Sequence, residues 1–239
     1  RGERCVAASL QGKTALVTGG ARRIGAAICR ALAARGAVVA VHYHHSEAEA
    51  VALGRELANG TLTVRGDLSQ PAEREWIFRE ASEWLGRVDI LVNNAAQFVR
   101  DGEADVAVMR AVNVTAPLEL AARVSEQTTG GCVIHLLDAW VDGSEGEGYR
   151  EYAASKRELA DSLAAHAREW APRVRVNGVA PGPALAPERQ REAAGRVLLA
   201  ERPTAEAVAH AVAFLAENEA ITGQILYVDG GQHLMRRMS

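Results

Sequence analysis

Short apolar runs that alternate with longer helical stretches constrain the fold of this chain more than any other feature of its sequence. We expect strands at Thr14–Thr18, Val38–His42, Leu62–Val64, Ile90–Asn93, Cys132–Leu137, Val174–Val179 and Gln224–Val228. We expect helices at Ala26–Arg35, Glu47–Leu57, Ala72–Trp84, Ala104–Glu126, Tyr152–Trp170 and Ala205–Ala216. Strands that are apolar on both faces and alternate with helices predict a parallel sheet covered on both sides. The expected fold class is a single doubly wound α/β domain, whose ligands bind beyond the carboxyl ends of the strands.

Length and composition agree with one domain and narrow the range of partners. The 239 residues, 48% of them hydrophobic, contain no repeat and no linker rich in Gly, Pro or Ser. We place the domain at residues 13–239, behind a flexible N-terminal segment at 1–12. A net charge of −3 gives no electrostatic case for nucleic acid or an anionic membrane as partner. No apolar run reaches the roughly 20 residues of a membrane helix. Cys5, Cys29 and Cys132 form no CxxC pair, which favours reduced thiols in a cytoplasmic protein.

The first expected strand ends in a glycine-rich turn, Gly19-Gly20-Ala21-Arg22-Arg23-Ile24-Gly25, after which an Ala-rich helix begins. Such a turn brings backbone N–H groups and the positive end of a helix to one place, which suits a pyrophosphate. Glycine is needed where the backbone approaches a phosphate closely or takes a positive φ. An ordinary turn would explain an isolated motif. Because this one opens the first βα unit of an alternating chain, we interpret it as a dinucleotide site.

The end of the second strand, His42-Tyr43-His44-His45-Ser46, indicates which dinucleotide is bound. Sheets that bind NAD usually carry an acidic residue here, which accepts hydrogen bonds from the ribose. This chain has none before Glu47, and His45, Ser46 and the Arg22-Arg23 pair suit the 2′-phosphate of NADPH. A metal site of His42, His44 and His45 is the alternative. No Cys or carboxylate completes a tetrahedral set, so we expect NADPH and no metal.

Further candidate residues follow the other strands. Asp67 comes after the third strand, where it can accept from an adenine amino group or simply cap a turn. Asn93-Asn94-Ala95-Ala96 ends the fourth strand; its small residues let a cofactor lie against the backbone, and its amides can pin the loop. Pro181-Gly182-Pro183 after the sixth strand is typical of a rigid turn.

Tyr152 and Lys156 are spaced as a general acid/base pair. Residues at i and i+4 share one face of a helix, and a nearby ammonium lowers the pKa of a phenol from about 10. We therefore expect Lys156 to lower the pKa of Tyr152, and Tyr152 to transfer protons. Tyr149 competes for this role, but its i+4 position is Ala153. Asn113 lies within an expected helix although Asn is a mediocre helix former; a kink or an inserted water would explain it.

Taken in order, these residues resemble the short-chain dehydrogenase/reductase family over nearly the whole chain, from Lys13 to Gly231. The shared pattern consists of Thr18-Gly19, Asp67, Asn93-Asn94-Ala95, Asn113, Tyr152, Lys156, Asn177, Pro181-Gly182 and Val228-Asp229-Gly230-Gly231. The resemblance implies a Rossmann-type domain with seven parallel strands, hydride transfer at a nicotinamide, and a homodimer or homotetramer. It implies that Tyr152 donates the proton, Lys156 holds the nicotinamide ribose and Asn113 anchors a water relay. The implied cofactor contacts are Gly19, Arg22, Arg23, Ile24, His44, His45, Ser46, Asp67, Leu68, Asn94, Ala95, Lys156, Pro181 and Gly182.

The chain departs from the family pattern at two positions. Arg23 replaces the middle glycine of the glycine-rich turn, where a guanidinium can touch the cofactor phosphates or the substrate. The serine that polarises a substrate carbonyl in the family is missing. Asp138 lies near its place, one residue further from Tyr152 than the family spacing predicts, and Ser144 lies too far along the loop. An ionised carboxylate would repel a developing alkoxide, whereas a carboxyl group can hold an amino-pyrimidine or protonate a ring nitrogen. Asp138 therefore favours reduction of a C=N bond.

Pteridine reductases, a branch of the same family, have this arrangement. The chain resembles them in Gly19–Gly25, His42–Ser46, Asp138-Ala139 and Phe98, which matches the aromatic residue that sandwiches a pterin against the nicotinamide. A buried core Phe98 is the alternative. We predict an NADPH-dependent reductase of a small, flat, pterin-like substrate bound by Arg23, Phe98, Asp138 and Tyr152. The expected catalytic residues are Tyr152, Lys156, Asp138 and Asn113.

Two other functions stay open at this point. One is an NADPH-dependent carbonyl reductase of the 3-oxoacyl or polyketide type, against which the missing serine speaks. The other is a non-catalytic NADP-binding protein, since one fold can host many functions. Against it stands the joint presence of Tyr152, Lys156 and Asn113, which a binding protein would not need.

Overall fold

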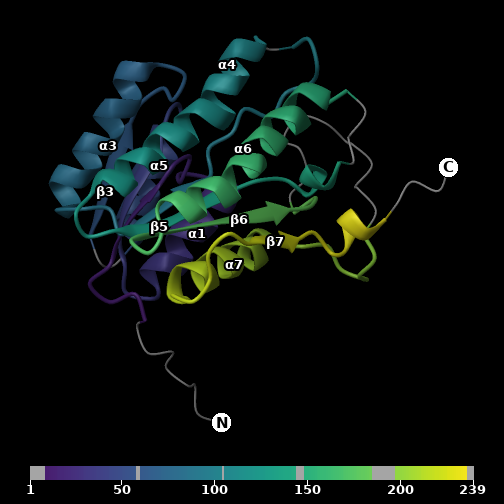
Figure 1. Ribbon diagram of the computed structural model, residues 1–239. Coiled ribbons are helices and arrows are strands. Elements are labelled where there is room, and N and C mark those ends of the chain that lie inside the picture. The colour runs from purple at the N-terminus through teal and green to yellow at the C-terminus, as the bar shows by residue number, and fades with distance from the viewer. Residues whose placement is uncertain (1–8, 58–59, 104, 144–147, 185–196, 236–239) are drawn as a thin grey trace.

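A sheet of seven parallel strands runs through the computed structural model, which describes residues 9–57, 60–103, 105–143, 148–184 and 197–235. The strand order is β3-β2-β1-β4-β5-β6-β7 (Figure 1). The strands are β1 Thr14–Val17, β2 Val38–Tyr43, β3 Thr61–Arg65, β4 Ile90–Asn93, β5 Gly131–Leu136, β6 Val174–Pro181 and β7 Ile225–Val228. This arrangement confirms the predicted doubly wound, Rossmann-type fold.

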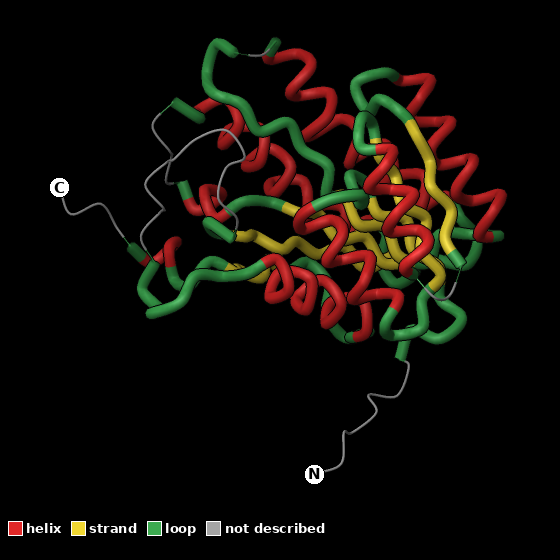
Figure 2. The backbone as a smooth tube through the Cα atoms, turned by 180° about the vertical axis from the view of Figure 1, so that it is seen from behind, coloured by secondary structure: helices red, strands yellow, loops and turns green. Residues whose placement is uncertain are grey.

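Helices cover both faces of the sheet, because each strand is apolar on both of its faces. One face carries α1 Arg23–Ala33, α2 Glu47–Glu56 and α7 Ala205–Glu217, and the other carries α3 Pro71–Leu85, α5 Ala116–Glu126 and α6 Arg150–Glu169. Figure 1 shows α1 and α7 below the sheet, and Figure 2 shows the same layers from behind. The first layer buries Ile28, Leu32 and Val212, and the second buries Ile77, Leu120 and Leu163.

The strand order reverses direction at β1, which pairs with β2 on one side and β4 on the other. Crossover connections leave such a switch point on opposite faces of the sheet. A crevice therefore opens beyond the carboxyl ends of β1 and β4, where ligands of doubly wound sheets bind.

The helix predicted at Ala104–Glu126 is present from Val106 to Glu126, but it is not α-helical throughout. It consists of α4 Val106–Arg110, a π-helical turn η1 at Ala111–Thr115, and α5. Asn113 lies inside the π turn, which is the local irregularity at this residue; a kink or an inserted water stays a prediction. Two short 3₁₀ helices, η2 at Ala139–Asp142 and η3 at Gln232–Leu234, were not predicted.

At least one residue just before the predicted boundary at residue 13 packs against the domain. The Leu10 side chain is buried in the core beneath α1, and its N–H donates to the Arg35 carbonyl at 2.9 Å. Cys5 and Ser144 lie outside the described residues. Within the described ranges, no helix is both long and apolar enough to cross a membrane.

Candidate active site

The glycine-rich turn after β1 is packed so closely that two of its glycines, Gly19 and Gly25, leave no room for a side chain. A Cβ at Gly25 would lie 2.1 Å from the carbonyl oxygen of Gly19, and one at Gly19 would lie 3.0 Å from the Cα of Ala95. Arg23 has φ 54° and is the only non-glycine with a positive φ in the described part of the chain. It therefore has a left-handed conformation, which glycine adopts more readily than other residues, at the first residue of α1.

The segment after β4 holds this turn in place. The Asn94 side chain donates to the carbonyls of Thr18 at 2.9 Å and Gly19 at 3.0 Å. The Thr18 hydroxyl accepts from the backbone N–H groups of Asn94 at 3.0 Å and Ala95 at 3.1 Å. The predicted pinning of the loop by an Asn amide is thus present, and it joins the two sides of the crevice.

His42, on β2, also holds the turn in place through hydrogen bonds to the backbone. Its Nδ1 accepts from the Gly19 N–H at 3.2 Å, and its Nε2 lies 3.0 Å from the Gly66 carbonyl oxygen, to which it donates. Burial lowers the pKa of His42 to about 4, so the ring is neutral. Because both of its ring nitrogens already have backbone partners, the metal alternative loses one of its three histidines. The described residues contain no group of three His, Cys, Asp or Glu side chains that could hold a metal.

The residues around the turn fit a dinucleotide phosphate. Arg22, His44 and His45 are exposed beside it, with the two imidazole rings stacked at 3.6 Å between centroids. Asp67 accepts from the Ser69 N–H at 2.8 Å, so its carboxylate shapes the turn after β3. On the far side, a Cβ at Gly182 would lie 2.7 Å from the Cα of Asp229, which explains the glycine there. The close backbone and the basic rim are what a phosphorylated dinucleotide requires.

Asp138 and Tyr152 meet at the carboxyl end of β5. The Tyr152 hydroxyl donates to Asp138 Oδ2 at 3.1 Å. Burial raises the pKa of Asp138 to about 6, and burial together with the adjacent Asp138 raises the pKa of Tyr152 well above its ordinary value. The predicted lowering of the Tyr152 pKa is therefore wrong for this arrangement. The phenol stays protonated, as a proton donor must.

Lys156 lies on the same face of α6 as Tyr152 but reaches a different partner. Its Nζ donates to the Leu136 carbonyl at 2.7 Å and lies 5.9 Å from the centre of the Tyr152 ring. Burial lowers the pKa of Lys156 to about 8. The spacing of four residues predicted a shared face, but it could not show that a strand carbonyl captures the ammonium.

Asn113 connects the loop after β4 with α6. Its Oδ1 accepts from the Gln97 N–H at 2.7 Å, and its Nδ2 donates to the Gln97 carbonyl at 3.1 Å and to the Ser155 hydroxyl at 3.0 Å. The side chain is fully buried. Its hydrogen bonds show a positioning role for the segment that carries Phe98, and the water relay stays a prediction.

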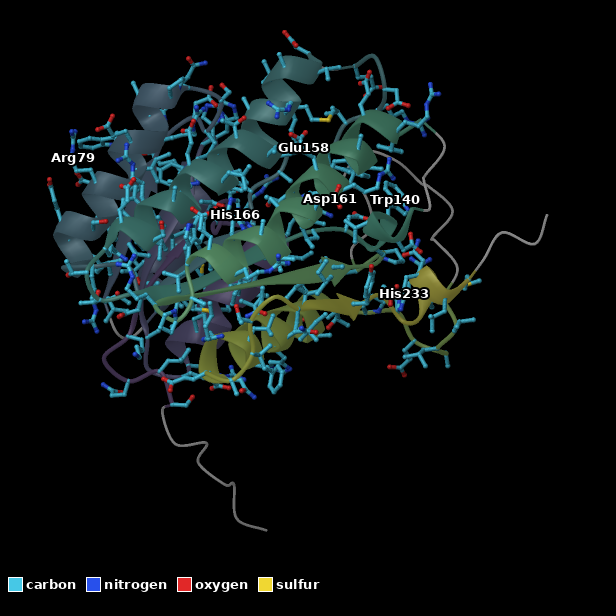
Figure 3. All side chains as sticks on the ribbon, in the orientation of Figure 1. Arg79, Trp140, Glu158, Asp161, His166 and His233 are labelled. Atoms are coloured by element: carbon cyan, nitrogen blue, oxygen red, sulfur yellow. The ribbon has the colours of Figure 1, made fainter. Side chains whose placement is uncertain are left out.

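Phe98 lies at the surface of the crevice, with 44% of it exposed. Its ring stacks on Tyr149 at 4.6 Å with 4° between the planes, and meets Tyr152 edge-on at 4.7 Å. The buried-core alternative for Phe98 is wrong. Trp140 and Tyr149 complete the aromatic group. The sequence analysis considered Tyr149 only as a competitor of Tyr152 for proton transfer, and it missed Trp140, whose only signal was its nearness to Asp138. Figure 3 shows Trp140 at the end of the molecule opposite Arg79.

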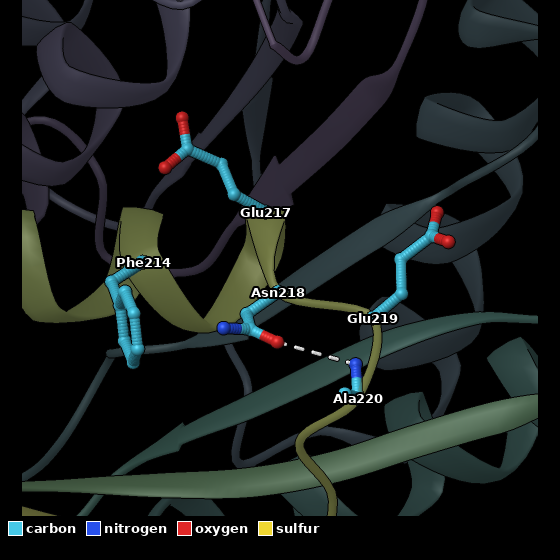
Figure 4. A pocket seen from close by; sticks show the side chains of 5 residues that line it. All are labelled: Phe214, Glu217, Asn218, Glu219 and Ala220. Carbon is cyan, nitrogen blue, oxygen red and sulfur yellow. Dashed lines mark hydrogen bonds between the residues drawn. The ribbon is translucent and has the colours of Figure 1, made fainter.

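A hollow at the C-terminal end of α7 does not take part in this site. Phe214, Glu217, Asn218, Glu219 and Ala220 line it (Figure 4). Asn218 Oδ1 accepts from the Ala220 N–H at 3.3 Å within its wall. None of the predicted site residues contributes to it, because it lies at the opposite end of the strands from the glycine-rich turn.

Comparison with known proteins agrees with this geometry. A family model described as Enoyl-(Acyl carrier protein) reductase matches residues 19–233. Pteridine reductase 1 from Leishmania tarentolae is 32% identical, covering 93% of this chain and 96% of its own length. The 3-oxoacyl-[acyl-carrier-protein] reductase FabG of Escherichia coli (strain K12) is 34% identical, and the match covers 95% of this chain and 100% of FabG. The crystal structure of FolM Alternative dihydrofolate reductase 1 from Brucella canis complexed with NADP is 33% identical, with a TM-score of 0.89, covering 97% and 98%. The chain belongs to the short-chain dehydrogenase/reductase family of oxidoreductases.

Proposed function

We propose that this protein is an NADPH-dependent reductase of a C=N bond in a dihydropterin or a related flat cyclic compound. The basic rim at Arg22, His44 and His45 supports NADPH, as do the NADP complexes of similar structures. The expected cofactor contacts on the other strands are Asp67, Leu68, Asn94, Ala95, Pro181 and Gly182. When bound, NADPH supplies the hydride.

The observation that carries the proposal is the hydrogen bond between Asp138 and Tyr152 in place of the usual serine. A carboxyl group with a pKa near 6 is partly protonated at neutral pH, so it can donate to a ring nitrogen or hold an amino-pyrimidine. Tyr152 is protonated and lies within reach of the same substrate edge. Asp138 and Tyr152 would stabilise the transition state of a carbonyl reduction less, because the ionised form of Asp138 repels a developing alkoxide.

The remaining residues position the substrate and supply charge. Phe98 is 44% exposed and offers apolar ring surface to a flat substrate, and Arg23 lies on the glycine-rich turn. Lys156 provides a buried positive charge near Tyr152, which favours any anionic character that develops on the phenol as its proton leaves. Proton donation by Tyr152 and Asp138 should contribute roughly 10²–10⁴ to the rate.

A carbonyl reductase of the 3-oxoacyl type is the second candidate, supported by the likeness to FabG over nearly the whole chain. Oxidation of NADPH should therefore be measured with dihydrobiopterin, dihydromonapterin, an acetoacetyl thioester and simple ketones. We expect turnover of the dihydropterins and its loss, by roughly 10²-fold or more, in Tyr152→Phe. Turnover confined to the carbonyl compounds would overturn the C=N assignment, and near-normal activity of Tyr152→Phe would overturn the role of Tyr152.

A further inference from the structure

Three aromatic rings from separate segments surround Tyr152. Phe98 follows β4, Trp140 lies in η2, and Tyr149 immediately precedes α6. The Trp140 ring centroid lies 6.3 Å from that of Phe98, 5.9 Å from Tyr149 and 6.1 Å from Tyr152. We call Phe98, Trp140 and Tyr149 the aromatic wall. It borders the Asp138–Tyr152 hydrogen bond, where the substrate must react.

The backbone of Trp140 is fixed on both sides. Asp138 Oδ1 accepts from the Trp140 N–H at 3.0 Å, which begins η2, and the Gly143 N–H donates to the Trp140 carbonyl at 3.2 Å, which ends it. Asp138 therefore uses one oxygen for Tyr152 and the other for Trp140. The position of the indole is tied to the position of the catalytic carboxyl.

Trp140 is only partly buried, although the neighbouring Tyr149 and Met109 are buried. Its partial exposure leaves apolar ring surface in contact with solvent, which a bound flat ring would cover. Phe98 is likewise partly exposed, over 44% of its surface. The ring centroids of the partly exposed Phe98 and Trp140 lie 4.7 Å and 6.1 Å from that of Tyr152. Together the two rings form an aromatic surface that is complementary to another flat ring.

We propose that Trp140 is a specificity-determining residue, which contacts the substrate and, together with Phe98, selects flat aromatic or heteroaromatic rings over linear acyl chains. This proposal rests on the proposed function for the identity of the preferred ring. A flat ring stacks against the wall without loss of conformational freedom, whereas a linear chain must be ordered to make the same contact.

The test compares Trp140→Ala, Trp140→Phe and a remote control, Trp76→Ala. Trp76 lies on α3, is 42% exposed, and its ring centroid lies 5.4 Å from the guanidinium carbon of Arg79. Figure 3 shows Arg79 at the end of the molecule opposite Trp140. From the strength of ring stacking, we expect Trp140→Ala to raise KM for the dihydropterin roughly 5- to 100-fold, with kcat within about threefold. Trp140→Phe should recover most of the loss, and Trp76→Ala should match the wild type.

A second readout does not depend on turnover. Titration of the NADP⁺-loaded protein with a pterin should quench tryptophan fluorescence in the wild type, and Trp140→Phe should lose that part of the quenching. An unchanged KM in Trp140→Ala together with undiminished quenching in Trp140→Phe would overturn the proposal.

A wild type that ignores dihydropterins would refute the proposed function but would leave this proposal testable. The ratio of kcat/KM for a flat aromatic ketone to that for an acetoacetyl thioester then takes the place of the dihydropterin. We expect Trp140→Ala to lower this ratio at least about fivefold. An unchanged ratio would show that Trp140 does not select for flat rings.

Discussion

At the scale of single residues, Asp138 carries the proposed preference for a C=N substrate over a carbonyl compound. One of its oxygens accepts from the Tyr152 hydroxyl and the other from the Trp140 N–H. Burial favours its neutral form and raises its pKa to about 6. The carboxyl group can therefore give up a proton in the range where the protein is expected to work.

Replacing Asp138 by Asn should remove this proton while keeping an acceptor for Trp140. We expect kcat/KM of the wild type on a dihydropterin to fall as the pH rises through about 6. In Asp138→Asn this fall of kcat/KM with pH should be absent, and the rate should be lower by a factor of roughly 10²–10⁴. Rates measured from pH 5 to 9 test this, and an unchanged fall in the variant would assign it to another group.

The same substitution should also change the stability of the protein with pH. The folded-state pKa of Asp138 lies above its ordinary value of 3.8. Its favourable contribution is therefore complete below that value and is lost as the pH rises through about 6. In urea unfolding, Asp138→Asn should compare more favourably with the wild type at pH 8 than at pH 4, and the opposite trend would contradict the burial of this carboxyl.

Tyr152 shows where inference from single residues ends. Spacing correctly placed Tyr152 and Lys156 on one face of α6, but it gave the wrong direction for the Tyr152 pKa. That direction depends on the burial of the phenol and on Asp138, which lies just after β5 and accepts the hydrogen bond of the phenol. Neither the burial nor this contact is encoded in local periodicity.

At the scale of elements, the π turn η1 is the unusual feature. It places Asn113 where three hydrogen bonds join the loop after β4 to α6. The apolar pattern continues through this region as in an ordinary helix, so the sequence predicted a single element. The only local signal was an Asn in a helical position, because a π turn is stabilised by contacts with distant segments.

Removing the Asn113 side chain should therefore loosen two elements at once. Asn113→Ala leaves the Gln97 N–H and carbonyl and the Ser155 hydroxyl without their partner. We expect a loss of about 2–4 kcal/mol in the free energy of unfolding, measured by urea denaturation. Ser155→Ala is the control; it removes one of the three bonds, together with the bond that the Ser155 hydroxyl donates to the Tyr152 carbonyl, and should cost less than Asn113→Ala. A loss below about 1 kcal/mol in Asn113→Ala would show that other contacts hold the turn.

At the scale of the whole molecule, the sequence predicted the fold well and the walls of the crevice poorly. Every predicted strand is present, since a parallel sheet buried on both faces leaves an apolar run for each strand. The contacts of Trp140 and Tyr149 were not predictable, because they arise where loops from β4, β5 and α6 converge. The homodimer or homotetramer stays a prediction.

Cofactor selectivity is also a property of the whole molecule, because bound ligand adds to the free energy of unfolding. NADP⁺ at 100 times its Kd should stabilise the protein by about 2.7 kcal/mol, measured as a thermal shift. His45→Asp places a carboxylate at the basic rim and should weaken NADP⁺ roughly tenfold or more, with little effect on NAD⁺.

The matched control for that substitution is His210→Asp, which makes the same change on the exposed surface of α7. It should leave both affinities unchanged. Equal weakening of NADP⁺ and NAD⁺ by His45→Asp would remove His45 from recognition of the 2′-phosphate.

The clamp between Thr18 and Asn94 has a consequence for how the protein is made. The glycine-rich turn is complete within the first βα unit, but the amide that holds it lies 76 residues further along the chain. A nascent chain that has emerged only through β3 contains the turn without its clamp. The turn therefore takes its working shape, and can hold the nucleotide in full, only after β4 has been made and has paired with β1.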